Sequence, residues 1–425
     1  MDTSCRLCRG GDLRSVLDLG ASPPCESFLT EDALDHPEPT YPLHVRLCAD
    51  CLLLQIPASI RPEETFVDYA YYSSFSDSWV EHARRFVAGA LDSGRLPHDG
   101  LLVEVASNDG YLLRHAVDAG VTCLGIEPSA NVSDAARKAG VPTLTAFLDE
   151  PTADAVRAEH GPAALVVANN VYAHIPDLNG FTRSLRTLVA DDGWVSIEVH
   201  HALNLVELGQ FDTVYHEHFQ YYTVLSAQRA LAEGGLALVD VELLASHGGS
   251  IRLWARPAAV AGEPEPSVER ALAAEDAAGL HTVDGYAGLA ERAVSVKNAL
   301  LDYLLAQRAA GARVVGYGAP GKGSTLLNYC GIRPDLLEYT VDRNPYKHGR
   351  FTPGTRIPIH PPQRLIDDRP DAVVVLPWNL DTEIIAQLSD TLDYPVDIVV
   401  PLPTLRITRI GDPADSTTTR RSSSR

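Results

Sequence analysis

The chain lacks any apolar run long enough to span a bilayer, and its first residues lack the apolar region of a secretory signal peptide. Basic residues are also few: 35 Lys and Arg stand against 56 Asp and Glu, a formal net charge of −21. A surface of that charge repels phosphate backbones and anionic lipid. We therefore expect a cytoplasmic protein that binds neither nucleic acid nor membranes. Repeats of solenoid period are absent as well, and 425 residues predict two or three domains.

Cysteine is sparse, but four of the seven cysteines stand in two pairs, Cys5-x-x-Cys8 and Cys48-x-x-Cys51. Disulfides are rare in a reducing compartment, which leaves free thiols, redox chemistry or metal ligation. Four thiolates in two close pairs satisfy a tetrahedral Zn²⁺ and leave no open coordination position. The pattern therefore predicts one structural zinc ion. The remaining cysteines are expected to be buried small hydrophobes: Cys25, Cys123 and Cys330.

Short apolar runs alternate with amphipathic helical patterns from residue 77 to residue 200, and again from residue 313 to residue 380. Strands that are apolar on both sides are typical of a parallel sheet covered by helices on both faces. In the first region we expect, among other elements, a helix over 181–193 and a strand over 194–200. Residues 262–308 predict a helical connection, and the low-complexity end 413–425 predicts disorder. The predicted fold class is α/β.

The stretch 103-VEVASNDGYLL-113 predicts a strand, a short polar loop and a helix, and Glu127 ends the next strand, in GIEPS. A doubly wound sheet binds nucleosides at such a loop, and a carboxylate on the second strand accepts from both ribose hydroxyls. The loop lacks the G-x-G-x-x-G of dinucleotide sites, since Gly110 is its one glycine. Glu104, Asn108 and Asp109 suit a cationic ligand without phosphates, such as S-adenosylmethionine. An acidic turn in another α/β fold is the alternative.

A second polar cluster lies in 211-FDTVYHEHFQYYT-223, where His216, Glu217 and His218 follow one another. Zinc proteases place two histidines one helical turn apart in H-E-x-x-H, whereas these histidines are two positions apart. Metal binding is therefore disfavoured. The stretch is either a structural polar loop or an acid/base device. An acid/base device requires a turn here, since Tyr215 and His218 would face opposite ways on a straight strand.

Taken in order, several stretches resemble the sugar C-methyltransferases of antibiotic deoxysugar biosynthesis: the paired cysteines, EVASNDGYLL, GIEPS, NNVYAHIPD, YHEHFQYY, HGGSIR, GYGAPGKGSTLLNY, DRNPYKHG and LPWN. The resemblance covers nearly the whole chain. It implies an N-terminal zinc-binding module, a central Rossmann-like sheet for S-adenosylmethionine, and a second Rossmann-like domain that helps to hold a TDP-sugar. Ala106 departs from the family pattern, which usually has glycine there. The extra methyl narrows the space for the cofactor's carboxypropyl arm.

The implied reaction needs a base at a carbon next to a ketone and a group that polarises the ketone oxygen. We predict His218 as the base, Glu217 as its orienting group or as the base itself, and Tyr215 as the donor to the enolate oxygen. The resemblance also places His174 and Tyr69 near the sugar. The predicted cofactor contacts are Glu104, Ala106, Asn108, Asp109, Gly110, Leu112, Glu127, Pro128 and Asn169.

A second glycine loop, Gly316-x-Gly318-x-x-Gly321, precedes Lys322, and Asp342 ends the next strand. Alone, this pattern indicates an NAD site. Kinase chemistry is disfavoured because a glycine follows this lysine, where a Walker loop has the Ser or Thr that holds Mg²⁺. Amides at a helix N-terminus and a lysine can neutralise a diphosphate. With the resemblance, the predicted substrate contacts are Asn170, Ser250, Lys322, Ser324, Lys347 and His348.

We therefore predict a zinc-binding domain over 1–65, an S-adenosylmethionine-binding methyltransferase domain over 66–260, a helical connection over 261–305, a Rossmann-like domain over 306–412 and a disordered tail over 413–425. The predicted function is methyl transfer to carbon 3 of a TDP-4-keto-deoxysugar by a monomer. An NAD-dependent sugar-nucleotide oxidoreductase and a zinc-domain scaffold are the alternatives. The sequence does not decide whether carbon 3 or carbon 5 is methylated, or whether carbons 2 and 3 carry amino or hydroxyl groups. It also leaves open whether Glu217 or His218 is the base, and the oligomeric state.

Overall fold

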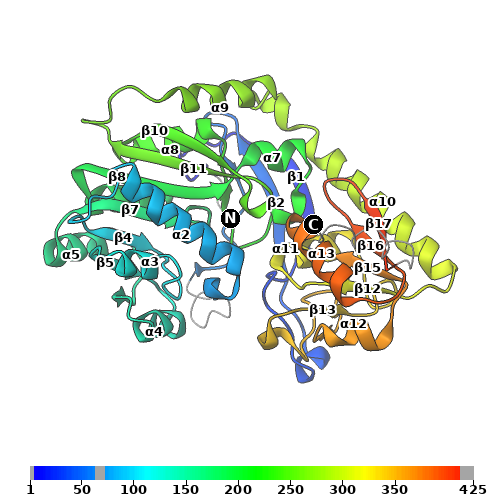
Figure 1. Cartoon of the computed structure of the whole chain (residues 1–425). Helices are drawn as coiled ribbons and strands as arrows, with labels where there is room; N and C mark the ends of the chain where they lie inside the picture. The colour runs from blue at the N-terminus through cyan, green and yellow to red at the C-terminus, as the bar shows by residue number, and fades with distance from the viewer. Residues whose placement is uncertain (1–3, 63–71, 412–425) are drawn as a thin grey trace, which may run out of the picture. The chain divides into compact units, whose positions relative to one another are not determined.

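The chain divides into two compact units (Figure 1). The computed structural model describes residues 4–62 and 72–411, so the tail predicted to be disordered lies outside the described residues. The first unit comprises Met1–Val16, Val45–Leu203 and Glu217–Tyr286. The second unit comprises Leu17–His44, Asn204–His216 and Ala287–Arg425. Each unit therefore draws on segments that are far apart in the sequence, and the predicted five-part division of the chain stays a prediction.

The first unit contains a seven-stranded sheet with the order β10-β11-β8-β7-β4-β5-β6. The strands from β8 to β6 run parallel, whereas β11 is antiparallel to both β8 and β10. The fold is α/β, as predicted, with an antiparallel edge that the sequence pattern did not indicate. The strands are β4 (Leu102–Val105), β5 (Cys123–Ile126), β6 (Thr143–Leu144), β7 (Ala163–Asn169), β8 (Val189–His200), β10 (Leu236–Leu244) and β11 (Ser250–Pro257).

Two apolar cores cover the two faces of this sheet, which explains why its strands are unbroken apolar runs. On β7, Leu165 and Val167 belong to one core and Val166 and Ala168 to the other, as the alternation of a strand requires. The first core includes α2 (Asp77–Asp92), α3 (Leu113–Asp118) and α4 (Ala130–Lys138). The second core includes α5 (Glu150–His160), α6 (Leu178–Leu188), α8 (Val224–Glu233) and α9 (Pro266–Ala277).

The helix predicted over 181–193 is α6, but it ends at Leu188, and the residues that follow belong to β8. Val189 is fully buried and pairs with Ala163 of β7. Gly193 lies so close to β7 that a Cβ there would come within 2.9 Å of two of its carbonyl oxygens. The prediction was wrong for 189–193 because this close backbone packing, which glycine permits, outweighs the local helical pattern.

A four-stranded sheet has the order β1-β2-β3-β9. Its first three strands flank the paired cysteines in the sequence. Strand β3 is antiparallel to both β2 and β9. Strand β9 belongs to the polar stretch 211–223, and the residues before it, 214–219, form neither helix nor strand and turn at His216 and Glu217. An acid/base role for this stretch requires such a turn. The strands are β1 (Leu13–Ser22), β2 (Tyr41–Cys48), β3 (Leu54–Gln55) and β9 (Gln220–Tyr221).

The second unit contains a six-stranded sheet with the order β14-β13-β12-β15-β16-β17, in which only β17 is antiparallel to its neighbour. This is the order of a doubly wound, Rossmann-like sheet with its first strand at the centre. The strands are β12 (Val314–Tyr317), β13 (Thr340–Val341), β14 (Ile359–His360), β15 (Ala372–Val375), β16 (Val396–Val400) and β17 (Arg406–Ile410). The helices of this unit include α10 (Leu289–Ala309), α11 (Gly321–Cys330), α12 (Gln363–Asp368) and α13 (Asp381–Thr391).

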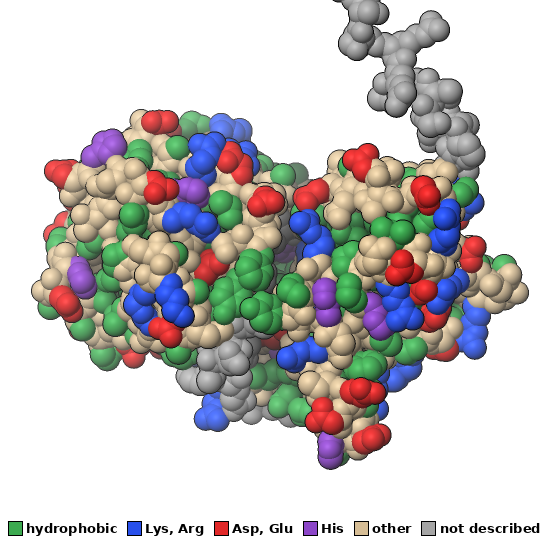
Figure 2. Space-filling view, turned by 60° about the horizontal axis from the view of Figure 1, so that its bottom comes forward, with side chains coloured by type: hydrophobic (Ala, Val, Ile, Leu, Met, Phe, Trp, Pro, Cys, Tyr) green, Lys and Arg blue, Asp and Glu red, His purple; other side chains and the backbone are tan. Residues whose placement is uncertain are grey.

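Within residues 4–62 and 72–411, no helix has both the length and the apolar character that crossing a membrane requires. Figure 2 shows acidic and basic side chains interspersed over the face that it draws.

Candidate functional site

Two matching turns bring the four paired cysteines together. In each Cys-x-x-Cys, the residue after the second cysteine donates its amide to the carbonyl of the first cysteine: Arg9 to Cys5 at 3.0 Å, and Leu52 to Cys48 at 2.9 Å. Arg9 and Leu52 both have positive φ, 64° and 58°. Each turn closes on itself in this way, which keeps its two sulfurs near each other.

The four sulfur atoms of Cys5, Cys8, Cys48 and Cys51 lie within 4.8 Å of one another. The sulfurs of Cys5 and Cys51 are 3.5 Å apart, as are those of Cys8 and Cys48. A tetrahedral zinc with Zn–S bonds of ~2.3 Å keeps its sulfurs roughly 3.8 Å apart. The hydrogen bond between Cys5 and Cys51 lowers the pKa of the Cys5 thiol and raises that of Cys51, as expected of two sulfurs that share one proton. The four cysteines form a site for one structural zinc ion.

The loop after β4 is fixed by Glu127 at the end of β5. Its Oε2 accepts from the Asn108 amide at 2.9 Å, and its Oε1 accepts from the Ser129 amide at 2.8 Å. The loop bends through left-handed conformations at Ala106 (φ 54°), Asn108 (φ 50°) and Gly110 (φ 78°). Glycine and asparagine adopt this region readily, whereas alanine is strained there. This chain therefore has alanine at a position where the family usually has glycine and where the backbone conformation favours glycine.

Acceptor groups converge where β4, β5 and β7 end. Glu104 is buried, and one oxygen on each of Glu104, Asp109 and Asn169 has no hydrogen-bond partner among the described residues. Burial raises the pKa of Glu104 well above its usual range, and the charge of Glu127 raises it further. Burial also raises the pKa of Glu127. A cationic ligand without phosphates stabilises such a set of carboxylates, whereas a diphosphate is repelled, so these residues fit S-adenosylmethionine.

Two other predicted cofactor contacts lie at the margins of this loop. Leu112 is fully buried in the core beneath α2 and α3, and Pro128 is half-buried between β5 and α4. Sequence reasoning missed the segment that precedes α2, in which the Ser73 amide donates to Asn108 Oδ1 at 2.8 Å. This segment therefore holds the Asn108 side chain, while Glu127 holds the Asn108 backbone.

A small cavity in the first unit brings together side chains from several predicted site segments. His174 follows β7 and contacts His218 edge to face, with 4.6 Å between the ring centroids. Asn170 has a left-handed backbone (φ 53°), and its amide donates to the Glu198 carbonyl at 2.7 Å. The cavity is lined by Asn170, Ala173, Val199, His200, His218, Gln220, Tyr221 and Tyr222.

The division between the two units falls inside the predicted catalytic stretch. Glu217, which is buried, and His218 belong to the first unit, whereas Tyr215 belongs to the second. His216 also belongs to the second unit, where its Nε2 donates to the Tyr41 carbonyl at 3.0 Å. His216 is thus part of the packing of that unit. Tyr69 lies outside the described residues.

His200 is a cavity residue that sequence reasoning missed. It ends β8 and pairs across the sheet with Ser250, a predicted substrate contact at the start of β11. Ser250 is buried, and its hydroxyl donates to the Ser246 carbonyl at 3.1 Å. A signal for His200 was available, because it is the last residue of the predicted strand 194–200, and ligand crevices lie at the carboxyl ends of such strands.

A buried ion network beside this cavity was also missed. The Oε2 of Glu198 accepts from Arg252 at 2.7 Å and lies 2.8 Å from His82 Nε2, while Ser246 donates to its Oε1 at 2.9 Å. Burial alone would raise the pKa of Glu198, but the bond to His82 and the charge of Arg252 hold it at about 2. Glu198 is therefore ionised and ties α2, β8 and β11 together.

The glycine loop of the second unit is filled by residues of that unit. The Oδ2 of Asp342 accepts from the Ala319 amide at 2.7 Å. Cys25 and Glu26 lie against the N-terminus of α11: a Cβ on Gly321 would come within 2.7 Å of the Cys25 sulfur and 3.1 Å of a Glu26 oxygen. Two side chains of the same unit, one of them acidic, thus border the helix end at which a dinucleotide's diphosphate binds in such folds. This arrangement disfavours the NAD interpretation.

Three of the four predicted substrate contacts of the second unit form hydrogen bonds within the unit. Lys322 donates to Asn379 Oδ1 at 2.8 Å. Ser324 is buried, and its hydroxyl has no hydrogen-bond partner among the described residues. Lys347 donates to a carbonyl of the glycine loop at 2.8 Å, and His348 donates to the Asp342 carbonyl at 2.7 Å. Their roles toward a substrate stay predictions.

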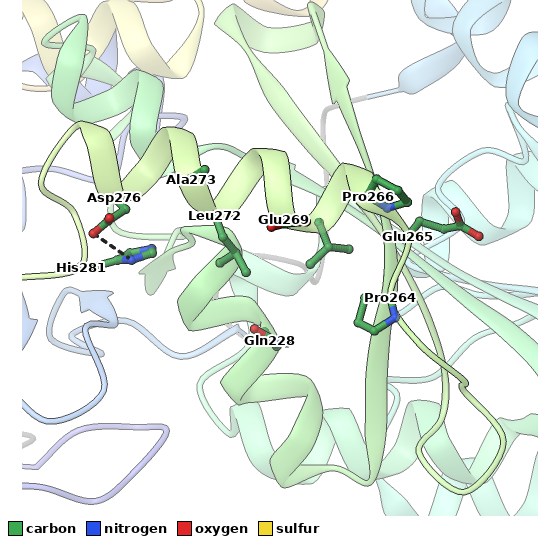
Figure 3. A pocket seen from close by; sticks show the side chains of 10 residues that line it. Gln228, Pro264, Glu265, Pro266, Glu269, Leu272, Ala273, Asp276 and His281 are labelled. Atoms are coloured by element: carbon green, nitrogen blue, oxygen red, sulfur yellow. Dashed lines mark ion pairs between the residues drawn. The ribbon is translucent and has the colours of Figure 1, made fainter.

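A groove of about 570 Å³ lies between α8 and α9 of the first unit. Figure 3 shows its lining, including the ion pair of His281 and Asp276, whose atoms are 3.4 Å apart. None of the predicted site residues lines this groove. The groove is therefore a feature separate from the cofactor loop and the histidine-lined cavity.

Comparisons with protein families agree with the fold and the site. A "Putative zinc binding domain" matches residues 5–66, a "Methyltransferase domain" matches residues 79–241, and a "C-methyltransferase C-terminal domain" matches residues 245–403. The class of protein is therefore an S-adenosylmethionine-dependent methyltransferase that carries a zinc site. The C-methyltransferase NovU of Streptomyces niveus is 33% identical over 403 residues, which cover 95% of this chain and 96% of that protein. The chain belongs to the sugar C-methyltransferase family.

Two solved methyltransferase structures resemble less than half of this chain. The CcbJ methyltransferase from Streptomyces caelestis is 14% identical, with 46% of this chain and 99% of that chain covered and a TM-score of 0.35. Magnesium protoporphyrin IX methyltransferase from Synechocystis PCC 6803 is 17% identical, with 41% of this chain and 82% of that chain covered and a TM-score of 0.34. Likenesses of this extent add nothing to the family assignment.

Proposed function

We propose that the protein transfers a methyl group from S-adenosylmethionine to carbon 3 of a TDP-linked 4-keto-deoxysugar. The observation that carries this proposal is the histidine-lined cavity, which lies in the same compact unit as the carboxylate-rich loop. The membership of the chain in the sugar C-methyltransferase family supports a carbon as the acceptor. A carbon becomes nucleophilic only when it loses a proton, and a neighbouring ketone makes that proton acidic.

His218 is proposed as the base that takes the proton from carbon 3. Burial lowers the pKa of the neighbouring His174 imidazole to about 4. A neutral ring at 4.6 Å places no positive charge beside His218 that would oppose its protonation. Glu217 is proposed to orient His218 and to stabilise its charged form. Tyr215 stays the proposed donor to the enolate oxygen, and Tyr69 stays a proposed neighbour of the sugar.

The electron pair of the broken C–H bond moves into an enolate, and the proton remains on the base. The enolate carbon then forms the new C–C bond, and the ketone is restored. When bound, S-adenosylmethionine supplies the methyl group and leaves as S-adenosylhomocysteine. In this proposal Glu127 holds the ribose hydroxyls, and Glu104, Asp109 and Asn169 provide the acceptor groups around the cationic part of the cofactor. Asn170 and Ser250 are proposed to bind the sugar.

The nucleotide part of the substrate is proposed to contact Lys322, Ser324, Lys347 and His348 of the second unit. Lys347 lies 3.3 Å from Glu26 of the same unit, and a lysine charge suits the phosphates of a nucleotide. The protein is further proposed to act as a cytoplasmic monomer.

The proposal is tested by incubating the purified protein with S-adenosylmethionine and a panel of TDP-4-keto-deoxysugars that carry an amino or a hydroxyl group at carbon 3. Product mass and the position of the new methyl group are read by mass spectrometry and NMR. We expect one added methyl group at carbon 3 and one equivalent of S-adenosylhomocysteine. A methyl group at carbon 5 or on a heteroatom, or no reaction with the whole panel, contradicts the proposal.

An NAD-dependent oxidoreductase is the rival reading of the second glycine loop. Because Cys25 and Glu26 fill that loop, we expect S-adenosylhomocysteine to raise the melting temperature and NAD to leave it unchanged. If NAD raises the melting temperature and S-adenosylhomocysteine does not, the oxidoreductase interpretation is favoured over methyl transfer.

A further inference from the structure

A buried cluster of the second unit joins the start of the stretch 211–223 to the helix that follows the glycine loop. Asp212 is fully buried, and its Oδ2 accepts from the indole N–H of Trp378 at 2.5 Å. The Lys322 ammonium lies 4.9 Å from the centre of the same indole ring and donates to Asn379 Oδ1 at 2.8 Å. Trp378 therefore contacts both the carboxylate and the ammonium.

Uncharged contacts already hold the segment around Asp212 against α11. The Thr325 hydroxyl donates to the Val214 carbonyl at 3.0 Å, and the rings of Phe211 and Tyr329 pack edge to face with 5.1 Å between their centroids. The indole N–H needs only an acceptor, which an amide side chain would supply as well. A buried carboxylate is costly unless another charge compensates it. Packing alone therefore does not account for an acid at position 212.

Lys322 supplies the compensating charge. Burial raises the pKa of Asp212 to about 6, although the charge of Lys322 acts to lower it, so the carboxyl is ionised at pH 7.5. Burial lowers the pKa of Lys322, and the charge of Asp212 opposes that effect. Glu26, the other carboxylate near the start of α11, lies 3.3 Å from Lys347 and has a cation of its own.

Two further titratable groups border the cluster from α10 and α11. Burial raises the pKa of the Cys330 thiol to about 12; the charge of Lys297 acts to lower it and that of Asp212 to raise it. Cys330 therefore stays neutral up to pH 10. The ammonium of Lys297 lies 5.0 Å from the centre of the Tyr329 ring.

Lys322 is the second residue of α11, at the helix end where a diphosphate binds in such folds. An ammonium has three N–H donors, and Asn379 accepts from one of them. We propose that Asp212 is a positioning residue, whose carboxylate fixes the Trp378 ring and holds the Lys322 ammonium charged and in place for the phosphates of the substrate. This inference rests on the proposed binding of the nucleotide by Lys322.

The test measures the affinity for TDP by calorimetric titration between pH 7.5 and pH 10 in wild type, Asp212→Asn, Lys322→Gln and the double variant. We expect Lys322→Gln to bind TDP about 10-fold more weakly at pH 7.5, because it loses a charge-assisted hydrogen bond. Wild type should lose the same increment of affinity at high pH, where Lys322 loses its proton. In Asp212→Asn that loss should begin about 1 pH unit lower, since a nearby opposite charge shifts a pKa by that amount or more.

Two controls separate this effect from others. The double variant should show no such change in its pH profile relative to Lys322→Gln, which also accounts for any titration of Lys347. Asp335→Asn removes an exposed carboxylate of the same unit and should match the wild type. The inference is overturned if Asp212→Asn keeps the pH profile of wild type, or if the profile moves equally when Lys322 is absent.

If Asp212→Asn does not fold, Lys322→Gln decides alone through its melting temperature at pH 6 and pH 8. A carboxyl whose folded-state pKa is raised loses stabilisation as the pH rises through that value. Without the ammonium, the pKa of Asp212 rises above about 6, so Lys322→Gln should lose more of its melting temperature than wild type between these pH values. Equal losses refute the pairing of the two charges.

The nucleotide contact and the reaction fail in different ways. TDP affinity that does not depend on Lys322 refutes the nucleotide contact and this inference with it. A protein that shows the expected TDP profiles but methylates none of the sugar panel would refute the proposed reaction and leave the part of Asp212 supported.

Discussion

The imidazole rings of His174 and His218 lie edge to face, with their centroids 4.6 Å apart. Burial lowers the pKa of His174 to about 4, although the backbone of Glu217 accepts a hydrogen bond from it and acts in the opposite direction. His174 is therefore neutral throughout the physiological range. It can position His218 without competing with it for a proton.

The depressed pKa of His174 predicts a loss of stability in acid. In the unfolded chain this histidine titrates near pH 6.5, so the unfolded state binds more protons than the folded state between that pH and about 4. The free energy of unfolding therefore falls as the pH drops through this window. The expected contribution is about 2 kcal/mol between pH 7.5 and pH 5.

Urea unfolding of wild type and His174→Asn at these two pH values measures that contribution. We expect the acid-induced loss to be smaller in His174→Asn, because the variant has no proton to gain at this position. Equal losses in the two proteins would show that the folded state lets His174 titrate normally.

Ala106 offers a second prediction, since its φ of 54° lies in the left-handed region. Alanine is destabilised there by roughly 1–2 kcal/mol, whereas glycine adopts this region freely at some entropic cost in the unfolded state. We expect Ala106→Gly to raise the free energy of unfolding by up to about 1 kcal/mol. Ala119→Gly is the matched control, because Ala119 is exposed with a φ of −83° and should be destabilised by glycine. Destabilisation by both substitutions would contradict the strain at Ala106.

The four-cysteine site predicts a metal-dependent fold of the N-terminal segment. Replacing Cys48 by serine removes one of four ligands, and structural zinc contributes directly to folding free energy. Elemental analysis should find one zinc per chain in wild type and in Cys330→Ser, whose cysteine lies in α11 and is not one of the four. We expect Cys48→Ser to lose the metal and to melt at a lower temperature. If elemental analysis finds no zinc in the purified wild type, the zinc assignment is wrong.

Glu127 is predicted to hold the cofactor through its ribose hydroxyls. Hydrogen bonds to a charged group contribute about 1.5–3 kcal/mol each, so Glu127→Gln should weaken S-adenosylhomocysteine binding by roughly 10-fold or more. The amide side chain of the variant can still accept a bond from Asn108 or Ser129, which limits damage to the loop. Calorimetric titration of wild type, Glu127→Gln and the exposed control Glu269→Ala checks this. Unchanged affinity in Glu127→Gln would refute the placement.

Much of the fold could be read from the sequence, because strands buried on both faces appear as apolar runs. Leu165 to Ala168 are such a run, and the alternation of their side chains between two cores is the physical reason. The zinc site could also be predicted from the sequence, since two Cys-x-x-Cys pairs are typical of a four-cysteine zinc site where disulfides do not form. The end of α6 was misjudged because the contact of Gly193 with β7 depends on tertiary packing.

The candidate site could be predicted only in part. Motif-bearing residues such as His174 and His218 were found, whereas His200 belongs to no motif and was indicated only by its place at the end of a predicted strand. The network around Glu198 joins residues 54 and 116 positions away from it in the sequence, Arg252 and His82. No local pattern reports contacts of that range.

The central claim is that His218 removes the hydrogen at carbon 3 of a 4-keto sugar nucleotide. NMR in D2O measures this most directly, by following that hydrogen with S-adenosylhomocysteine bound, so that no methyl transfer follows. The account predicts exchange at carbon 3 well above the rate without protein, and a loss of about 100-fold or more in His218→Asn at unchanged cofactor affinity. Exchange that is absent at carbon 3, or that persists in His218→Asn, would contradict it.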